Sequence, residues 1–272
     1  MKFGICNEIF QNWKLEDAMA YAKKAGYDGI EIAPFTICKN YVSEISADQR
    51  REIREPAARI GIAITGIHWV LVQAEGMYVT HPDTAIREKT ARYFVELVDF
   101  CGDIGGKRII VGSPKQRNLM EGVSPEQGWK WALDVFRSAV KRAEERGIII
   151  CFEPLAPAET NFINTAEDGI RFTNELNSPS FKIIIDVKAM SSESKPIPQI
   201  IRESSPNFSY FHANDANLKG PGFGEVDFHP IAAALKEVGY QDWVSVEVFK
   251  FEEGPEVIAT KSIEYLKKVF AA

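Results

Sequence analysis

The sequence lacks any long run of apolar residues. Of its 272 residues, 45% are hydrophobic, yet no segment approaches the roughly 20 consecutive apolar residues that a membrane-spanning helix needs. The first ten residues, MKFGICNEIF, also lack the basic and then apolar pattern of a secretory signal peptide. These absences argue against a membrane partner and predict a cytoplasmic protein.

Cysteine is scarce, and an excess of basic charge is missing. The four cysteines form no CxxC pair or other zinc-like spacing, and Cys6 and Cys151 lie within apolar segments. We expect these two to be small buried hydrophobic residues. The formal net charge of −6 argues against nucleic acid as a partner, because binding to a phosphate backbone requires basic surface.

A recurring pattern fills the second half of the chain. Four short apolar segments, rich in β-branched and aromatic residues, each lead to a side chain that can bind a metal ion. They are IIICFEP with Glu153, KIIIDVK with Asp186, SYFHAND with His212 and WVSVEVF with Glu247. Such segments are typical of buried parallel strands, and the intervals between them each leave room for one crossover helix. In a parallel barrel all four strand ends would lie at one rim, where active sites occur.

Four further strands are predicted in the first half. They are KFGICN at the N-terminus, GIEIAPF at 29–35, IAITGIHWVL from Ile62, and KRIIVGS at 107–113. Helix signals separate the strands. Ser124 is a predicted N-cap, followed by Pro125 in the first turn and Gln127 as the capping-box partner. Thr165 is a second predicted N-cap, and Pro255 begins a last predicted helix. Eight alternating units favour a single α/β domain over residues 1–272, a (β/α)8 TIM barrel, over an open sheet.

The four strand-end residues suggest a metal site. Three carboxylates in a partly desolvated pocket repel one another, and a divalent cation would compensate their charge. An oxygen-rich set with one imidazole suits Mn²⁺, Mg²⁺ or Co²⁺ better than a sulfur-rich zinc centre. Four unrelated polar residues are the simpler alternative, but their occurrence in successive units favours one site. Such a cation could stabilise an enediolate formed by removing a proton next to a substrate carbonyl.

On these motifs the sequence resembles the xylose isomerase-like TIM barrel superfamily of sugar isomerases and epimerases, and the ketose 3-epimerases and inosose isomerases most. The resemblance runs from the first predicted strand to the last, and its strongest part is the ordered set of Glu153, Asp186, His212 and Glu247. It implies that the four residues bind one divalent metal ion. We expect this ion to be Mn²⁺, with Mg²⁺ or Co²⁺ as the alternatives. It also implies that Glu153 and Glu247 are the catalytic acid and base. The alternative for both is metal binding without proton transfer.

Two loops extend the resemblance. EPLAPAETNFINT is similar to the epimerase segment after the fifth strand, and Glu159 takes the place of a glutamate that contacts substrate there. HANDANLKGPGFGEVDF resembles the superfamily loop after the seventh strand. The resemblance also implies a small carbohydrate-like substrate and a homo-oligomer, either a dimer or a tetramer.

Two positions depart from the epimerase pattern. Ala189 stands where those enzymes carry a histidine, and Leu218 stands where they carry an arginine. Both family residues contact substrate oxygens, so ordinary ketose 3-epimerase activity is in doubt. Lys188 lies two residues past Asp186 and would share its side of an extended strand. It could replace a lost contact, or it could be a solvated lysine.

Other residues near the predicted rim are candidate substrate contacts. His68 and Trp69 end the third predicted strand, and His68 could equally be a hydrogen-bonded strand-end histidine. The loop GSPKQRN after the fourth strand offers Gln116 and Arg117, with a solvated loop as the alternative. The segment GPGFG could admit a phosphate, but Lys219 is the only basic residue beside it.

Four functions remain open from the sequence. The favoured one is a metal-dependent isomerase or epimerase acting on a keto-sugar, a keto-polyol or a related hydroxy-ketone. A lyase or dehydratase would share its first step and differ in the fate of the intermediate. His68 matches one zinc position of the AP-endonuclease-like phosphodiesterases, but this function is disfavoured because their histidines at the place of Ala189 and after strand four are missing and the net charge is acidic. A non-catalytic sugar-binding barrel is disfavoured by the complete ligand set.

Overall fold

Eight parallel strands form a closed barrel in the computed structural model, which describes residues 1–271. Each strand pairs with its sequence neighbours, and β8 pairs with β1 to close the sheet. The strands are β1 Lys2–Cys6, β2 Gly29–Ile32, β3 Ala63–Ile67, β4 Arg108–Val111, β5 Ile149–Phe152, β6 Phe181–Asp186, β7 Phe208–Ala213 and β8 Trp243–Val246. The predicted (β/α)8 TIM barrel is confirmed.

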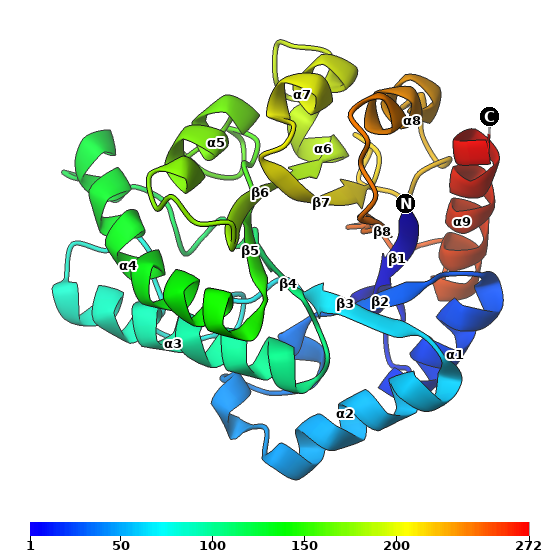
Figure 1. Cartoon of the computed structure of the whole chain (residues 1–272), viewed down its shortest axis with the longest axis horizontal. Coiled ribbons are helices and arrows are strands. Elements are labelled where there is room, and N and C mark those ends of the chain that lie inside the picture. Colours follow the sequence, from blue (N-terminus) through cyan, green and yellow to red (C-terminus); the bar gives the residue numbers. More distant parts are fainter. Residues whose placement is uncertain (272) are drawn as a thin grey trace.

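Helices surround the strands and bury their outer faces (Figure 1). The last helix packs beside the first, so the final unit closes against the N-terminal one. The α-helices are α1 Leu15–Ala25, α2 Ala47–Ile60, α3 Thr84–Asp103, α4 Pro125–Arg146, α5 Ala166–Asn174, α6 Val187–Met190, α7 Ile197–Ser204, α8 Phe228–Glu237 and α9 Pro255–Ala271, and the short 3₁₀ turns are η1 Asn7–Ile9, η2 Pro34–Thr36 and η3 Val42–Glu44.

The core has two parts because side chains alternate across each strand. Ile109 and Val111 pack in the outer layer against the helices, whereas Ile110 belongs to a separate cluster inside the barrel. Cys151 joins that inner cluster and is fully buried, and Cys6 is also fully buried, with its sulfur close to Glu31 and His212 inside the barrel. The expectation that both cysteines are buried small residues is confirmed.

Two predicted strands end earlier than the sequence pattern suggested. The second ends at Ile32, because Pro34 begins η2. The third ends at Ile67 rather than continuing through Leu71, and Trp69 adopts a left-handed backbone with φ of 53°. These early breaks place His68 and Trp69 on the rim rather than within the sheet.

The predicted helix starts are confirmed. Ser124 caps α4 by accepting a hydrogen bond from the Gln127 backbone N–H, and Pro125 is the first helical residue. Thr165 caps α5 through the Asp168 backbone N–H, and Pro255 begins α9. Each of these helix starts marks the end of the loop that precedes it at the rim of the barrel.

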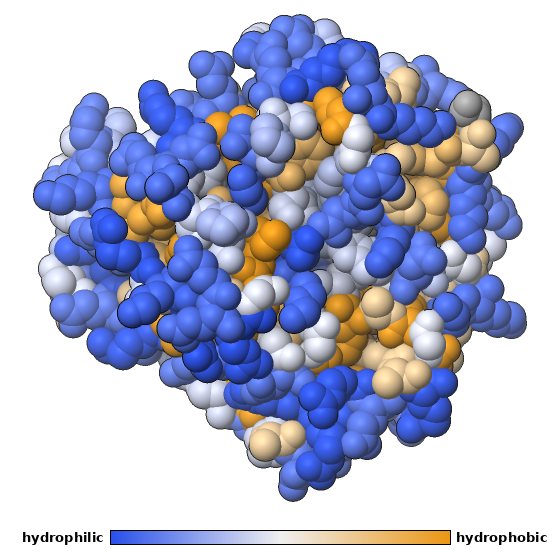
Figure 2. Space-filling model, viewed as in Figure 1, coloured by the Kyte–Doolittle hydropathy of each residue, from blue (hydrophilic) through white to orange (hydrophobic). Residues whose placement is uncertain are grey.

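Hydrophilic side chains cover most of the face seen in Figure 2, with smaller hydrophobic areas between them. Among the described residues, no helix combines the length and apolar character that crossing a membrane requires.

Candidate metal centre

The four predicted ligands meet at the carboxyl ends of β5 to β8. Glu153 and Glu247 each follow the last residue of a strand, Asp186 ends β6, and His212 lies next to Asp186 in the sheet register. One ligand atom from each lies within 4.8 Å of the others, and all four side chains are buried. His212 Nδ1 lies 3.1 Å from Glu247 Oε2 and 4.0 Å from Asp186 Oδ2.

The carboxylates oppose one another's ionisation. Burial, together with the nearby charges of Asp186 and Glu247, raises the pKa of Glu153 to about 8. Burial and Glu247 likewise raise the pKa of Asp186. Burial also acts on Glu247, but His212 outweighs it and lowers the pKa of that carboxyl. A divalent cation among these groups would relieve the repulsion.

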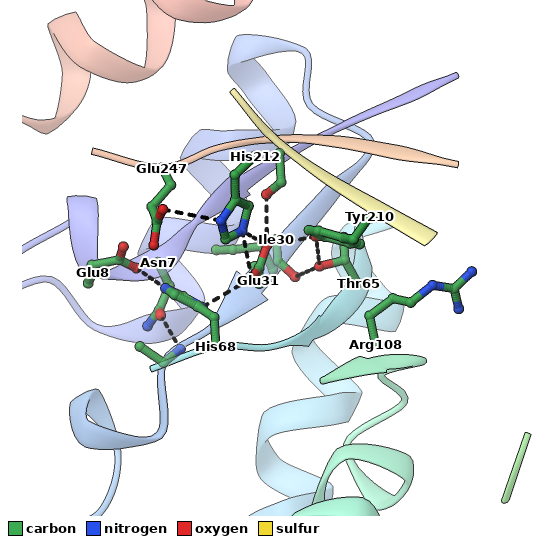
Figure 3. Close-up of polar contacts among 12 residues, drawn as sticks. Asn7, Glu8, Ile30, Glu31, Thr65, His68, Arg108, Tyr210, His212 and Glu247 are labelled. Atoms are coloured by element: carbon green, nitrogen blue, oxygen red, sulfur yellow. Dashed lines mark hydrogen bonds and ion pairs between the residues drawn. The ribbon is translucent and has the colours of Figure 1, made fainter. Parts of the chain in front are cut away.

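Glu31 holds the imidazole of His212 from beneath. His212 Nε2 lies 3.2 and 3.3 Å from the two oxygens of the Glu31 carboxylate (Figure 3). Tyr210 and Ser245 also donate to Glu31, at 2.7 and 2.9 Å. Burial opposes the charge of Glu31, but His212 and His68 lower its pKa to about 2. When Nε2–H donates to Glu31, the opposite nitrogen, which has no hydrogen-bond partner in the described chain, is free to bind metal.

Asn214 and backbone groups orient Asp186. Asn214 Nδ2 donates to Asp186 Oδ2 at 2.5 Å, and its own Oδ1 accepts from the Lys188 backbone N–H at 2.8 Å. The Ala189 backbone N–H donates to Asp186 Oδ1 at 2.7 Å, so Asp186 is the N-cap of the helical turn α6. One oxygen of Asp186 is therefore fixed by the backbone and the other by an amide.

Gly112 leaves room for Glu153. A Cβ at position 112 would lie 1.8 Å from Glu153 Oε2, so the carboxylate could not keep its present position. Gly112, Asn214 and Glu31 were not among the residues predicted for the site from the sequence. The one available signal was Glu31 itself, a charged residue inside the apolar strand GIEI.

A pocket of about 320 Å³, counted out to its open mouth, lies beside two of the four ligands, Glu153 and Glu247. Its wall includes the candidate catalytic residues Glu153 and Glu247 and the predicted substrate contacts Glu159, Lys188, His68 and Trp69. The structure therefore places these four residues at the pocket, and their contact with substrate stays a prediction.

Lys188 reaches the pocket by a different route from the predicted one. It lies in α6, not on an extension of β6, because Asp186 starts a helical turn. Its ammonium group bonds Glu159 Oε1 at 2.6 Å and lies 4.2 Å from the centre of the Phe249 ring. Only 10% of the side chain is exposed, so the solvated-lysine alternative is wrong.

His68 is held between two carboxylates. Its Nε2 lies 2.7 Å from Glu8 Oε2, and its Nδ1 lies 3.4 Å from Glu31 Oε1 (Figure 3). Its neighbour Trp69 packs edge-on against Phe249, with ring centroids 6.1 Å apart. The two residues form a fixed wall of the pocket.

Gln116 and Arg117 do not line this pocket. The guanidinium of Arg117 is buried 4.8 Å from the centre of the Phe152 ring, with no hydrogen-bond partner in the described chain, and burial lowers its pKa to about 10. Gln116 lines a separate surface hollow together with Lys115. Lys219, the basic residue beside GPGFG, is paired with Glu253.

Known proteins of similar sequence are sugar epimerases. The chain is 26% identical to the D-psicose 3-epimerase of Ruminiclostridium cellulolyticum over 92% of its length and 84% of that protein. It is 24% identical to the 3-dehydro-D-guloside 4-epimerase of Escherichia coli, covering 98% of this chain and 99% of that one.

Solved structures agree on the fold. The D-psicose 3-epimerase of Clostridium cellulolyticum H10 superposes with a TM-score of 0.88 at 22% identity, covering 99% of both chains. The 3-keto-D-glucoside 4-epimerase of E. coli superposes with a TM-score of 0.85 at 22% identity, covering 98% of this chain and 99% of that one. The sequence pattern of the xylose isomerase-like TIM barrel family matches residues 19–269, so the chain belongs to that family.

Proposed function

We propose that the protein is a divalent-metal-dependent isomerase or epimerase that moves a proton next to the carbonyl of a keto-sugar, keto-polyol or related hydroxy-ketone. The observation that carries the proposal is the buried set of Glu153, Asp186, His212 and Glu247, which converge from four successive strands and of which Glu153 and Glu247 line the pocket. The sugar epimerases among its relatives support the substrate class.

The residues present fit a hard divalent cation. Three carboxylates and one imidazole supply oxygen and nitrogen donors, and the unpartnered Nδ1 of His212 is directed toward the carboxylates. We expect Mn²⁺, with Mg²⁺ or Co²⁺ as substitutes. When bound, the cation would supply positive charge to the substrate oxygens as the neighbouring carbon loses its proton.

Glu153 and Glu247 are the proposed acid and base. They stand at the ends of β5 and β8 and reach the pocket from different strands, so a substrate carbon between them is accessible from two sides. One carboxylate removes the proton, and the other returns a proton to the opposite face. Asp186 and His212, which are held by Asn214 and Glu31, have the metal-binding role alone.

Substrate oxygens would meet fixed polar groups along the pocket wall. The ion pair of Glu159 with Lys188 offers both an acceptor and a charged donor, and His68 lies on another part of the wall. Lys188 thus supplies a positive charge near the site, although the histidine and arginine of the epimerase pattern are replaced by Ala189 and Leu218.

Isosteric variants test the proposed roles. With Mn²⁺ and a panel of ketoses and keto-polyols, Glu153→Gln and Glu247→Gln should each lower turnover about 10²- to 10⁴-fold while the circular dichroism spectrum is retained. Glu126→Gln, on the exposed first turn of α4, is the matched control. Full activity in Glu247→Gln with full metal content would overturn the mechanism. An elimination product in place of an epimer would assign the lyase alternative.

A further inference from the structure

Lys188 is the only lysine or arginine among the described residues that line the pocket. Its side chain is 10% exposed, and the one hydrogen-bond acceptor that the described chain offers its ammonium group is Glu159 Oε1, at 2.6 Å. An ammonium group has three N–H donors, so two remain for a ligand in the pocket. Because donors of a buried charge are costly to leave without acceptors, this spare capacity indicates a binding role.

The ammonium group of Lys188 shares the pocket with the two glutamates proposed to move the proton. Glu153 and Glu247 line the same space of about 320 Å³. The Phe249 ring, whose centre lies 4.2 Å from the ammonium nitrogen, covers one side of the charge. A substrate carbon between the two glutamates therefore brings its own oxygens into the same small space as the ammonium group.

Both ends of the Lys188 side chain are held in place. At its base, the Lys188 backbone N–H donates to Asn214 Oδ1 at 2.8 Å, and Asn214 in turn donates to the proposed ligand Asp186. At its tip, the ammonium group is bonded to Glu159. A charge that is fixed before the reaction begins needs no reorganisation as the reaction proceeds.

Ala189 and Leu218 place apolar side chains where the epimerase pattern has a histidine and an arginine. Leu218 contributes its backbone carbonyl instead, which accepts from the N–H groups of Phe249 and Lys250 at 2.9 and 3.1 Å. It thereby holds the loop that carries the Phe249 ring against the Lys188 ammonium group. These positions offer no charged donor to a substrate, and Lys188 does.

Removal of a proton next to a carbonyl creates negative charge on oxygen. The electron pair of the C–H bond forms a C=C bond, the carbonyl electron pair moves onto the oxygen, and the proton goes to a glutamate carboxylate. A fixed ammonium group in a pocket that excludes water stabilises such a charge far more than it would in bulk water. Lys188 keeps its own protons throughout this step.

We propose that Lys188 is an additional catalytic residue, whose ammonium group donates a hydrogen bond to the substrate oxygen that gains negative charge. Glu159 is then a positioning residue that keeps the ammonium group at the pocket wall. This inference rests on the proposed function for the reaction itself, and it assigns the stabilising charge to a residue outside the four proposed metal ligands.

Kinetics of a neutral variant test the role of Lys188. With the keto compound that the wild type turns over, Lys188→Met should lower kcat about 10²- to 10³-fold and change KM much less, because the charge develops mainly in the transition state. The affinity for Mn²⁺ and the circular dichroism spectrum should be retained. Lys188→Arg, which keeps the charge, should recover part of the lost kcat. Lys195→Met removes a lysine that is paired with Glu203 at 2.7 Å outside the pocket, and it should keep the wild-type kcat.

A double variant separates positioning from direct contact. Glu159→Gln should lower kcat, and the combined Glu159→Gln and Lys188→Met variant should be no slower than Lys188→Met alone, because Glu159 acts through Lys188. Losses that multiply in the double variant would mean that Glu159 acts independently, and they would overturn its positioning role.

An unreactive anionic probe tests the same contact without turnover. Glycolohydroxamate has two adjacent oxygens that resemble those of an enediolate, and its affinity for the Mn²⁺-loaded protein should fall about 10- to 100-fold in Lys188→Met but not in Lys195→Met. Equal affinity in Lys188→Met and the wild type would overturn the inference.

Proton exchange distinguishes the two proposals. Metal-dependent exchange on a ketose that survives in full in Lys188→Met would reject the catalytic role of Lys188 and leave the proposed function standing. Hydroxamate binding that depends on Lys188, without exchange on any keto compound in the wild type, would reject the proposed function and support Lys188 as the contact for an anionic oxygen.

Discussion

Glu31 determines how His212 is presented to the candidate metal centre. It is fully buried inside the barrel and meets His212, Tyr210 and Ser245 from two other strands. Because Tyr210, Ser245 and His212 all approach the Glu31 carboxylate, it acts there as a hydrogen-bond acceptor. A permanent acceptor fixes the hydrogen of His212 on Nε2 and leaves Nδ1 for the metal.

Replacing Glu31 with glutamine should weaken metal binding. Glutamine keeps the shape but loses the charge that orients and polarises His212, so the affinity for Mn²⁺ should fall about 10- to 100-fold. Titration calorimetry of the apoprotein measures this directly, with Glu126→Gln as the control. Equal Mn²⁺ affinity in Glu31→Gln and the wild type would show that Glu31 does not support the metal centre.

Gly112→Ala should displace the Glu153 carboxylate without replacing any of the proposed ligand residues. The added Cβ would fall 1.8 Å from Glu153 Oε2, so the carboxylate must turn away. Because catalysis tolerates such misplacement poorly, turnover should fall on the order of 100-fold. Kinetics and metal affinity should be measured on the same preparation, together with a thermal unfolding curve. Unchanged turnover would mean that Glu153 works from another position.

At the scale of elements, the loops after the strands decide which side chains enter the pocket. The sequence pattern predicted the strands well, because each is a short apolar run bounded by turn residues. It did not predict that Asp186 would cap a helical turn, and so it gave Lys188 an extended backbone. A side chain bonded to its own downstream backbone leaves little trace in hydrophobic periodicity.

Ion pairs connect three of the outer helices. Asp103, at the end of α3, accepts from Arg50 of α2 and from Arg146 of α4, each at 2.8 Å. Arg142 and Arg146 also bind Asp99 one turn earlier in α3, at 2.8 and 3.1 Å. The cluster ties α2, α3 and α4 together at their ends.

Asp103→Asn should destabilise the fold in a pH-dependent way. Burial opposes the charge of Asp103, but Arg146 and Arg50 together outweigh it and lower its pKa below the ordinary 3.8. Its stabilisation is therefore present above the ordinary pKa and is lost as the pH falls through the lowered value. We expect a loss of about 1 kcal/mol at pH 7, with the difference from the wild type vanishing once the pH lies below the lowered pKa of Asp103. Urea unfolding at several pH values measures it, and a constant difference down to acid pH would contradict this account.

At the scale of the whole molecule, the closed barrel and the meeting of four strand ends could be predicted from sequence. Parallel strands place their carboxyl ends at one rim of the barrel. Topology alone therefore predicts that ligand residues far apart in the chain lie close together in space. The same argument does not identify Glu8, Glu31 or Asn214. A single polar residue adds no periodic signal to the sequence, and its role depends on which side chains surround it in the fold. Arg117 illustrates the same limit, because a polar loop residue proved to be buried beside Phe152. The dimer or tetramer implied by the family resemblance stays a prediction.

Solvent exchange tests the central claim most directly. Protein loaded with Mn²⁺ would be incubated in D₂O with ketoses, inososes and 3-keto-sugars, including 3-keto-disaccharides, and the loss of C–H signal followed by NMR beside a metal-stripped control. We predict exchange at a carbon next to the carbonyl that requires metal and is lost in Glu247→Gln. Bound metal at the four ligands without exchange in any compound would contradict carbon-acid chemistry at this site.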